Sequence, residues 1–157
     1  MHPKAVLLMV AVIFAAVVPL ASAQQEDVVH HSDYVVIPHM KGSLALQVSS
    51  IAGLWYLPAG DDKASQLRVL SPVLADAKTL TGADAETLWT SIRARGEEFV
   101  FVAHMGGNLA IPRAQIRTAY YSVDSGAPRL RLVYDGDPNG KTIDGDEATK
   151  VWNEIQR

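Results

Sequence analysis

The chain has 157 residues, a formal net charge of −3 at pH 7 and no cysteine. The absence of cysteine excludes a disulfide framework and the attachment of a lipid at a cysteine. The acidic balance argues against nucleic acid and anionic membranes as partners, because both favour a clearly basic surface.

The first 23 residues have the pattern of a cleavable secretory signal peptide. A short basic start precedes an apolar run over residues 5–21, which ends in the small residues that a signal peptidase requires, Ala21-Ser22-Ala23. The run is short for a membrane span, which needs about 20 residues. We therefore expect a mature chain that begins at Gln24, with a polar lead-in over residues 24–33, in the bacterial periplasm or outside the cell. A retained membrane anchor is the alternative.

The rest of the chain contains an internal repeat, with one unit over residues 34–95 and the other over residues 96–157. Residues 34–56 match residues 99–121 at an offset of 65, and beyond a loop that is two residues shorter in the second unit the offset is 63. The matching pairs include His39 with His104, Gly42 with Gly107, Tyr56 with Tyr121, Arg68 with Arg131, and Trp89 with Trp152. A repeat of this length predicts two copies of one supersecondary unit.

Each unit begins with predicted strands and turns. Runs of β-branched and aromatic residues separated by glycine-containing turns are typical of hairpins. The expected strands are residues 34–38, 44–48, a strand that starts at Ile51, and 67–70, with counterparts at 99–103, 109–111, from Ile116, and 129–134.

Each unit ends in an amphipathic helix. The apolar residues stand at i, i+3, i+4 and i+7, which places them on one helix face. They are Ala85, Leu88, Trp89 and Ile92 in the first unit, and Ala148, Val151, Trp152 and Ile155 in the second. We expect the two tryptophans to be equivalent core residues.

These elements predict an α+β fold, in which two antiparallel, strand-rich units are each closed by a C-terminal helix. A unit of about 60 residues has little core of its own. We therefore expect the two units to pack as one pseudo-two-fold domain, and two separate tethered domains are the alternative. The order of elements resembles, in topology alone, the Whirly and PUR-type proteins that bind single-stranded nucleic acids. The resemblance extends to no motif, and a fold alone does not carry a function.

One segment has the spacing of a calcium-binding loop. Asp135, Asp137 and Asn139 stand at positions 1, 3 and 5, a glycine follows at position 6, and Asp146 stands at position 12. A strand rather than a helix is expected before the segment, and Asp-Pro-Asn-Gly is also an ordinary turn between strands. We favour the turn and expect no cofactor, and calcium is the alternative at this segment.

Four residues are candidates for binding a ligand. His39 and His104 occupy equivalent positions in the repeat, and imidazoles with nearby carboxylates can hold zinc or copper. Each stands beside a turn, however, where a surface residue needs no function. Arg117 and Arg131 are expected on an exposed face near tyrosines, which is the composition of a site for an anion or polyanion. A solvated face is the alternative.

No motif of a known catalytic mechanism is present in the sequence. The sequence therefore predicts an exported, non-enzymatic binding or interaction module for an unknown protein or small ligand in the cell envelope, with no nucleic-acid partner. The alternative is a small metal-dependent or hydrolytic enzyme that uses His39, His104 and nearby carboxylates.

Overall fold

The computed structural model describes residues 33–157. The predicted signal peptide and nearly all of the predicted lead-in lie outside the described residues. Within residues 33–157, no helix has both the length and the apolar character that crossing a membrane requires.

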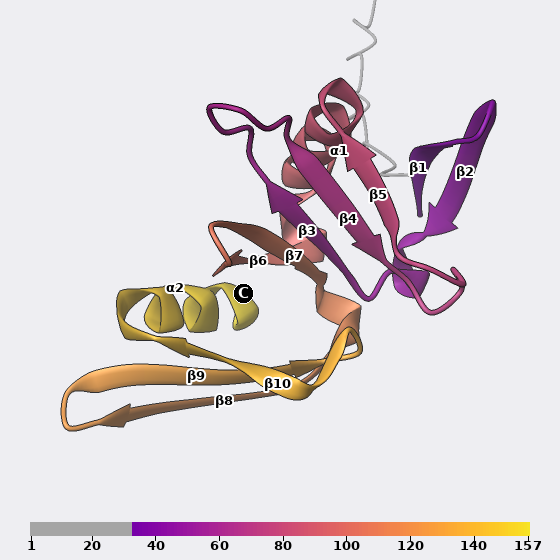
Figure 1. Cartoon of the computed structure of the whole chain (residues 1–157). Coiled ribbons are helices and arrows are strands. Elements are labelled where there is room, and N and C mark those ends of the chain that lie inside the picture. The colour runs from indigo at the N-terminus through magenta and orange to yellow at the C-terminus, as the bar shows by residue number, and fades with distance from the viewer. Residues whose placement is uncertain (1–32) are drawn as a thin grey trace, which may run out of the picture. The chain divides into compact units, whose positions relative to one another are not determined.

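The two halves of the described chain have the same order of elements, five strands followed by an α-helix (Figure 1). The first half contains β1 (Tyr34–His39), β2 (Gly42–Gln47), β3 (Gly53–Leu57), β4 (Gln66–Leu70), β5 (Lys78–Thr81) and α1 (Ala83–Ala94). The second half contains β6 (Phe99–His104), β7 (Gly107–Pro112), β8 (Ile116–Asp124), β9 (Ala127–Tyr134), β10 (Asp137–Asp144) and α2 (Gly145–Ile155). Short 3-10 turns lie at Val48–Ser50, Gly96–Glu98 and Arg113–Gln115.

The strands form three antiparallel sheets, so the α+β class is as predicted. Their orders are β1-β2, β5-β4-β3-β7-β6 and β10-β9-β8. The hairpin β6–β7 of the second half thus extends the sheet of the first half, whereas the hairpin β1–β2 forms a sheet of its own (Figure 1). The predicted pseudo-two-fold packing is therefore not what the sheets show, because the two equivalent hairpins have different neighbours.

The alternation of buried and exposed residues along β9 explains how the three-stranded sheet is built. Leu130, Leu132 and Tyr134 are buried, while Arg129 and Arg131 between them are exposed. Successive residues of a strand point to opposite faces, so one face of β8–β9–β10 packs against α2 and the other faces water.

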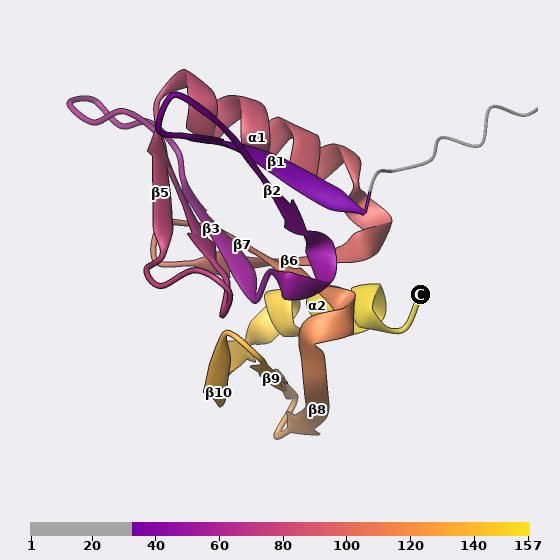
Figure 2. The same ribbon diagram turned by 90° about the vertical axis from the view of Figure 1, so that its right-hand side faces the viewer.

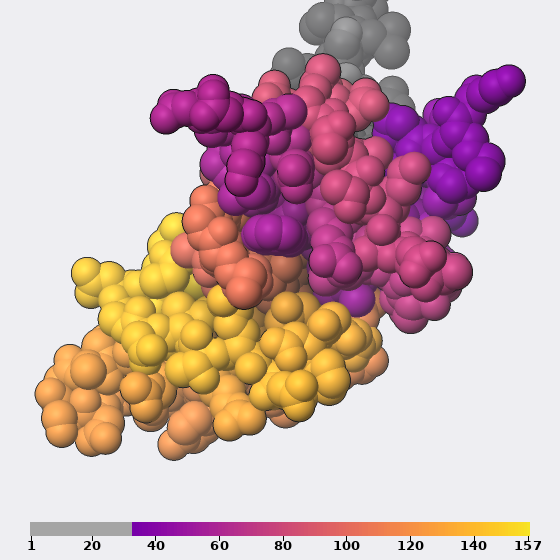
Figure 3. Space-filling view, viewed as in Figure 1, coloured from indigo at the N-terminus to yellow at the C-terminus, as the bar shows by residue number. Residues whose placement is uncertain are grey.

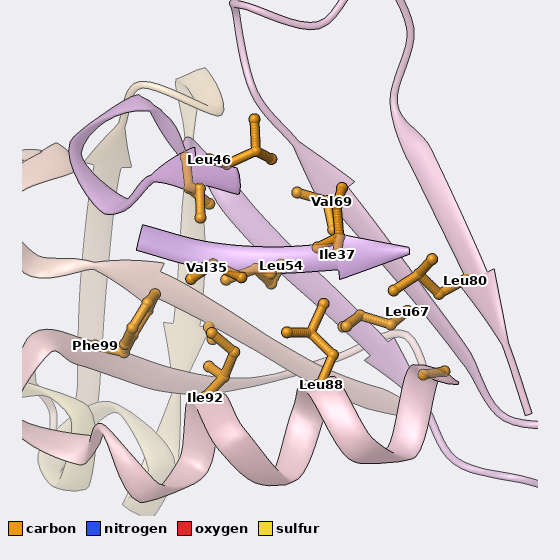
Figure 4. Packing of buried hydrophobic residues seen from close by; sticks show 13 residues of the cluster. Val35, Ile37, Leu46, Leu54, Leu67, Val69, Leu80, Leu88, Ile92 and Phe99 are labelled. Carbon is orange, nitrogen blue, oxygen red and sulfur yellow. The ribbon is translucent and has the colours of Figure 1, made fainter. Parts of the chain in front are cut away.

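The buried side chains form two clusters rather than one shared core. The first lies among α1, β1–β2 and β3–β5, where Leu88 and Ile92 of α1 point toward Val35, Ile37 and Leu54 (Figures 2 and 4). The second lies among α2, β8–β10 and β6–β7. The hairpin β6–β7 contributes to both clusters, because alternate residues on its strands point to opposite faces. This hairpin is the element that ties the two halves together.

Candidate functional site

The two halves meet where β7 pairs with β3. The register places Leu54 opposite Ala110, Trp55 opposite Leu109 and Tyr56 opposite Asn108. We call this pairing the internal junction. It joins strands that are far apart in the sequence. No turn connects them directly, so the packing of the two halves determines how they pair.

Trp55 and Gly107 lie where the two strands of the internal junction approach each other closely. The indole Nε1 of Trp55 donates a hydrogen bond to the carbonyl oxygen of His104 at 3.3 Å, and its ring meets the imidazole edge-on at 6.2 Å. A Cβ on Gly107 would overlap the carbonyl oxygen of Tyr56. A glycine is therefore required at this position, because the two backbones approach too closely for any side chain.

Each helix presents its tryptophan to a tyrosine of the sheet beneath it. Trp89 stacks on Tyr56 with ring centroids 4.9 Å apart, and Trp152 stacks on Tyr121 at 5.5 Å, both with an interplanar angle of 6°. Both tryptophans are half-buried at the margins of the clusters. The two tryptophans therefore pack against the buried clusters in equivalent ways, but they are only partly buried rather than the fully buried core residues that the sequence predicts.

The first helix has one aromatic contact more than the second among the described residues. Phe101 of the hairpin β6–β7 meets the ring of Trp89 edge-on at 5.7 Å, and the guanidinium of Arg93 lies 5.0 Å from the centre of the Phe101 ring. The hairpin of the second half therefore covers the tryptophan of the first half.

His104 has a basic neighbour that the sequence did not predict. The Nζ of Lys141 lies 2.7 Å from the Nδ1 of His104. Burial lowers the pKa of His104, and the charge of Lys141 lowers it further, while Asp137 acts in the opposite direction. Burial likewise lowers the pKa of Lys141. A neutral imidazole can accept a hydrogen bond from the ammonium group, so a neutral His104 avoids two adjacent positive charges.

The two predicted histidines lie in different hairpins. His39 ends β1 and is exposed, in the two-stranded sheet, whereas His104 ends β6 in the five-stranded sheet. The proposed histidine–carboxylate metal site is not formed, since the described residues contain no group of three or more His, Cys, Asp or Glu placed to hold a metal ion.

The four predicted calcium ligands are not brought together either. Asp135 forms an ion pair with Arg117, and the carboxylate of Asp137 accepts a hydrogen bond from the backbone N–H of Asn139 at 3.1 Å. Asp146 lies in the first turn of α2. The turn between β9 and β10 lies at Asp135 and Gly136, so the predicted Asp-Pro-Asn-Gly turn is displaced, and residues 137–140 are the start of β10.

The two predicted arginines lie on the water-facing side of β8–β9–β10. Arg117 contacts Asp135 at 2.5 Å, and Arg131 donates a hydrogen bond to the carbonyl oxygen of Asn139 at 3.1 Å. Tyr120 stands directly opposite Arg131 across the β8–β9 pair, and its side chain is 69% exposed. The exposed face therefore combines an aromatic ring with an arginine, although Asp135 and Asp144 balance the neighbouring arginines.

An open groove lies beside α2. It has a volume of about 1020 Å³ and is lined by both signs of charge, with Glu97, Arg113 and Lys150 among its residues. Arg113 donates hydrogen bonds to the carbonyl oxygens of Glu97 and Glu154. The groove thus holds a structural arginine that links α2 to the turn before β6.

Comparison with known proteins gives one distant structural neighbour. No family model matches the chain, and no curated protein matches it. The chain is similar to the solved structure of a LytTr DNA-binding domain of a methyl-accepting/DNA response regulator from Bacillus cereus, with 14% identity, a TM-score of 0.43, and coverage of 80% of this chain and 97% of that chain. At this identity and TM-score the likeness assigns no function to this chain.

This neighbour is nevertheless at odds with the function predicted from the sequence. The neighbour is described as a DNA-binding domain, which conflicts with the prediction of an exported binding module and with the expectation of no nucleic-acid partner. We correct those predictions accordingly. Nothing in the structure or the comparison supports the signal peptide, and the location of the protein stays a prediction.

Proposed function

We propose that this chain is an assembly protein, which associates with copies of itself through the free edges of its strands. The proposal includes the repeat: residues 34–95 and 96–157 are two copies of one unit. The identical order of elements, the matching hairpin registers and the matching tryptophan–tyrosine stacks support this relation. The observation that carries the function is the uncovered edge of β8.

β8 has the properties of a strand that accepts another strand. It is nine residues long and lies at the edge of its sheet, next to β9 alone. Residues 118–123 carry no charge, and Tyr120 is largely exposed. Proteins usually protect an edge strand with charge, a proline or a short length, because its unpaired backbone groups otherwise attract another chain.

The hairpin β1–β2 is a second uncovered element. It pairs with no other strand of the described chain, and a two-stranded sheet is marginally stable unless something packs on it. One face packs on α1 through Val35, Ile37 and Leu46. The opposite face exposes Val36, whose side chain is 57% exposed. In the space-filling view the tip of this hairpin projects from the surface (indigo, Figure 3).

Self-association is tested by size-exclusion chromatography with light scattering on the full chain and on the Tyr120→Lys variant. A lysine on an edge strand disfavours pairing, so we expect the variant to dissociate at concentrations at which the wild type is oligomeric. Val73→Lys is the matched control, because Val73 is 64% exposed but lies in the loop between β4 and β5. An oligomer that Tyr120→Lys leaves intact would contradict a role for β8.

Nucleic-acid binding is a second candidate function, favoured by the position of Tyr120 opposite Arg131. A base can stack on an exposed ring while an arginine contacts the phosphate. Exposed ion pairs such as Arg129 with Asp144 contribute little, so a phosphate can replace the carboxylate.

This candidate is tested by fluorescence anisotropy with a labelled single-stranded oligonucleotide at several salt concentrations. If it is correct, Arg131→Ala weakens binding and lowers the salt slope by about 1. The matched control is Arg68→Ala, at the equivalent exposed position of β4. Absence of binding by the wild type at low salt would eliminate the candidate.

A further inference from the structure

The repeat gives each strand of the internal junction a counterpart that lacks its partner. By the offset of 65, β7 corresponds to β2, and β3 corresponds to β8. β7 pairs with β3 within the chain, but among the strands of residues 33–157 β2 pairs only with β1, and β8 only with β9. Each copy of the chain therefore has one unused surface of each kind.

We propose that β2 of one copy pairs with β8 of a second copy, in the register of the internal junction. The inference rests on the proposed self-association and names the two surfaces that meet. Transferring the register by 65 residues places Ala45 opposite Ala119, Leu44 opposite Tyr120, and Ser43 opposite Tyr121. We call this pairing the external junction.

Gly42 is a first independent observation in favour of the external junction. Its counterpart Gly107 must be glycine, because its backbone lies against the backbone of Tyr56. Among the described residues Gly42 has no such neighbour, since apart from its two chain neighbours the nearest heavy atom to a Cβ there is the carbonyl oxygen of His39 at 4.0 Å, and its φ is not positive. A glycine is needed at this position only when a strand such as β8 approaches, with Tyr121 in the place of Tyr56.

The outer face of the hairpin β1–β2 is a second observation. Val36 is the counterpart of Phe101, which covers Trp89 of the first helix. In the external junction Val36 therefore packs on Trp152 of the second copy, beside the Trp152–Tyr121 stack. The contact buries the exposed side chain of Val36 against Trp152, which lies at the margin of the second cluster. Burial of this apolar surface is favourable by the hydrophobic effect.

Tyr120 and His39 are a third observation. Tyr120 is the counterpart of Trp55, which lies against His104 in the internal junction. His39 is the counterpart of His104, and it is exposed at the end of its hairpin. The external junction places these two exposed side chains together and gives the repeated histidine a structural role in each copy.

The external junction joins two different surfaces, so it is head-to-tail. Such contacts generate a closed ring when the rotation between copies closes and an open filament when it does not. In either case each copy uses its hairpin to bind one neighbour and β8 to bind another.

Mixing two blocked variants of the full chain tests the direction of assembly. Val36→Lys blocks the hairpin and leaves β8 open, whereas Tyr120→Lys blocks β8 and leaves the hairpin open. Both positions are exposed within the chain, so circular dichroism and the melting temperature should match the wild type. Each variant alone should associate at least about tenfold more weakly than the wild type. An equimolar mixture should form a one-to-one dimer that grows no further.

Disulfide trapping tests the register, on a chain that has no cysteine of its own. Opposite residues of an antiparallel pair have Cα atoms about 4.5–5.5 Å apart, within the about 4.4–6.8 Å that a disulfide bridges. The double variant Ala45→Cys with Ala119→Cys should give a ladder of covalent multimers on a non-reducing gel. Each single variant can give only a dimer. Ser43→Cys with Ala119→Cys is the control, because diagonal neighbours stand about 7–8 Å apart.

The outcomes separate this inference from the proposed function. If Val36→Lys stays oligomeric, Tyr120→Lys is monomeric and Ala119→Cys alone is trapped efficiently, the assembly pairs β8 with β8. The proposed function then stands and the external junction is wrong. If the wild type is monomeric at every concentration, the proposed function itself is wrong.

Discussion

Gly42 and Gly107 occupy the same position in two equivalent hairpins but have different surroundings. Gly107 lies against the backbone of Tyr56, whereas apart from the two chain neighbours of Gly42 no heavy atom of the described chain lies closer than 4.0 Å to the place of a Cβ on Gly42. The sequence alone predicts turns at both glycines and cannot distinguish them. Their difference appears only when the neighbour of each strand is known.

Alanine at these two positions should therefore affect different properties, the stability of the fold at Gly107 and self-association at Gly42. Gly107→Ala forces a methyl group into the internal junction, and we expect it to destabilise the fold by about 1–3 kcal/mol, as overpacking does. Gly42→Ala should leave the unfolding free energy of the monomer nearly unchanged and weaken self-association. Urea unfolding at low concentration measures the first effect, and light scattering measures the second. A Gly42→Ala variant that assembles like the wild type would count against the external junction.

At the level of elements, α1 and α2 are similar in sequence, but their tryptophans contact different numbers of aromatic rings among the described residues. The ring of Trp89 contacts both Tyr56 and Phe101. Within the described residues, the ring of Trp152 contacts one aromatic ring, that of Tyr121. Phe101 comes from the hairpin β6–β7, so the second half supplies part of the packing of the first helix.

Substituting each tryptophan with alanine should therefore lower the free energy of unfolding by different amounts. We expect Trp89→Ala to cost about 3 kcal/mol, at the lower end for a large aromatic residue since the ring is half-buried. Trp152→Ala should cost about 1 kcal/mol less in the monomer, because an aromatic pair contributes about 0.5–1.5 kcal/mol. Urea unfolding at low protein concentration provides both values. Equal losses would mean that Phe101 contributes nothing to the stability of α1.

The sequence predicted elements better than it predicted the pairing of the two halves. Periodicity identified the helix faces, and Ala85, Leu88 and Ile92 are buried as expected. The pairing of β7 with β3 was missed, because local alternation shows which face of a strand is buried but not which strand lies beside it. The contact of His104 with Lys141 was missed for the same reason, since the two residues are 37 positions apart.

At the scale of the whole molecule, the described chain has two buried clusters that share one hairpin. If the two halves are copies of one unit, as we propose, the surfaces at the two ends need a cap or another copy to cover them. Here one end is the hairpin β1–β2 and the other is the edge of β8. The proposed head-to-tail association would cover both ends with the kind of strand pairing that joins the two halves.

Sedimentation velocity of the wild-type full chain over a wide concentration range is the most direct test of self-association. We expect the average mass to rise with concentration from the 17.0 kDa of a single chain to species of two or more copies. We expect the same rise at high salt, because the surfaces that meet are uncharged strand edges and apolar side chains. A single species of one chain at every concentration would contradict it.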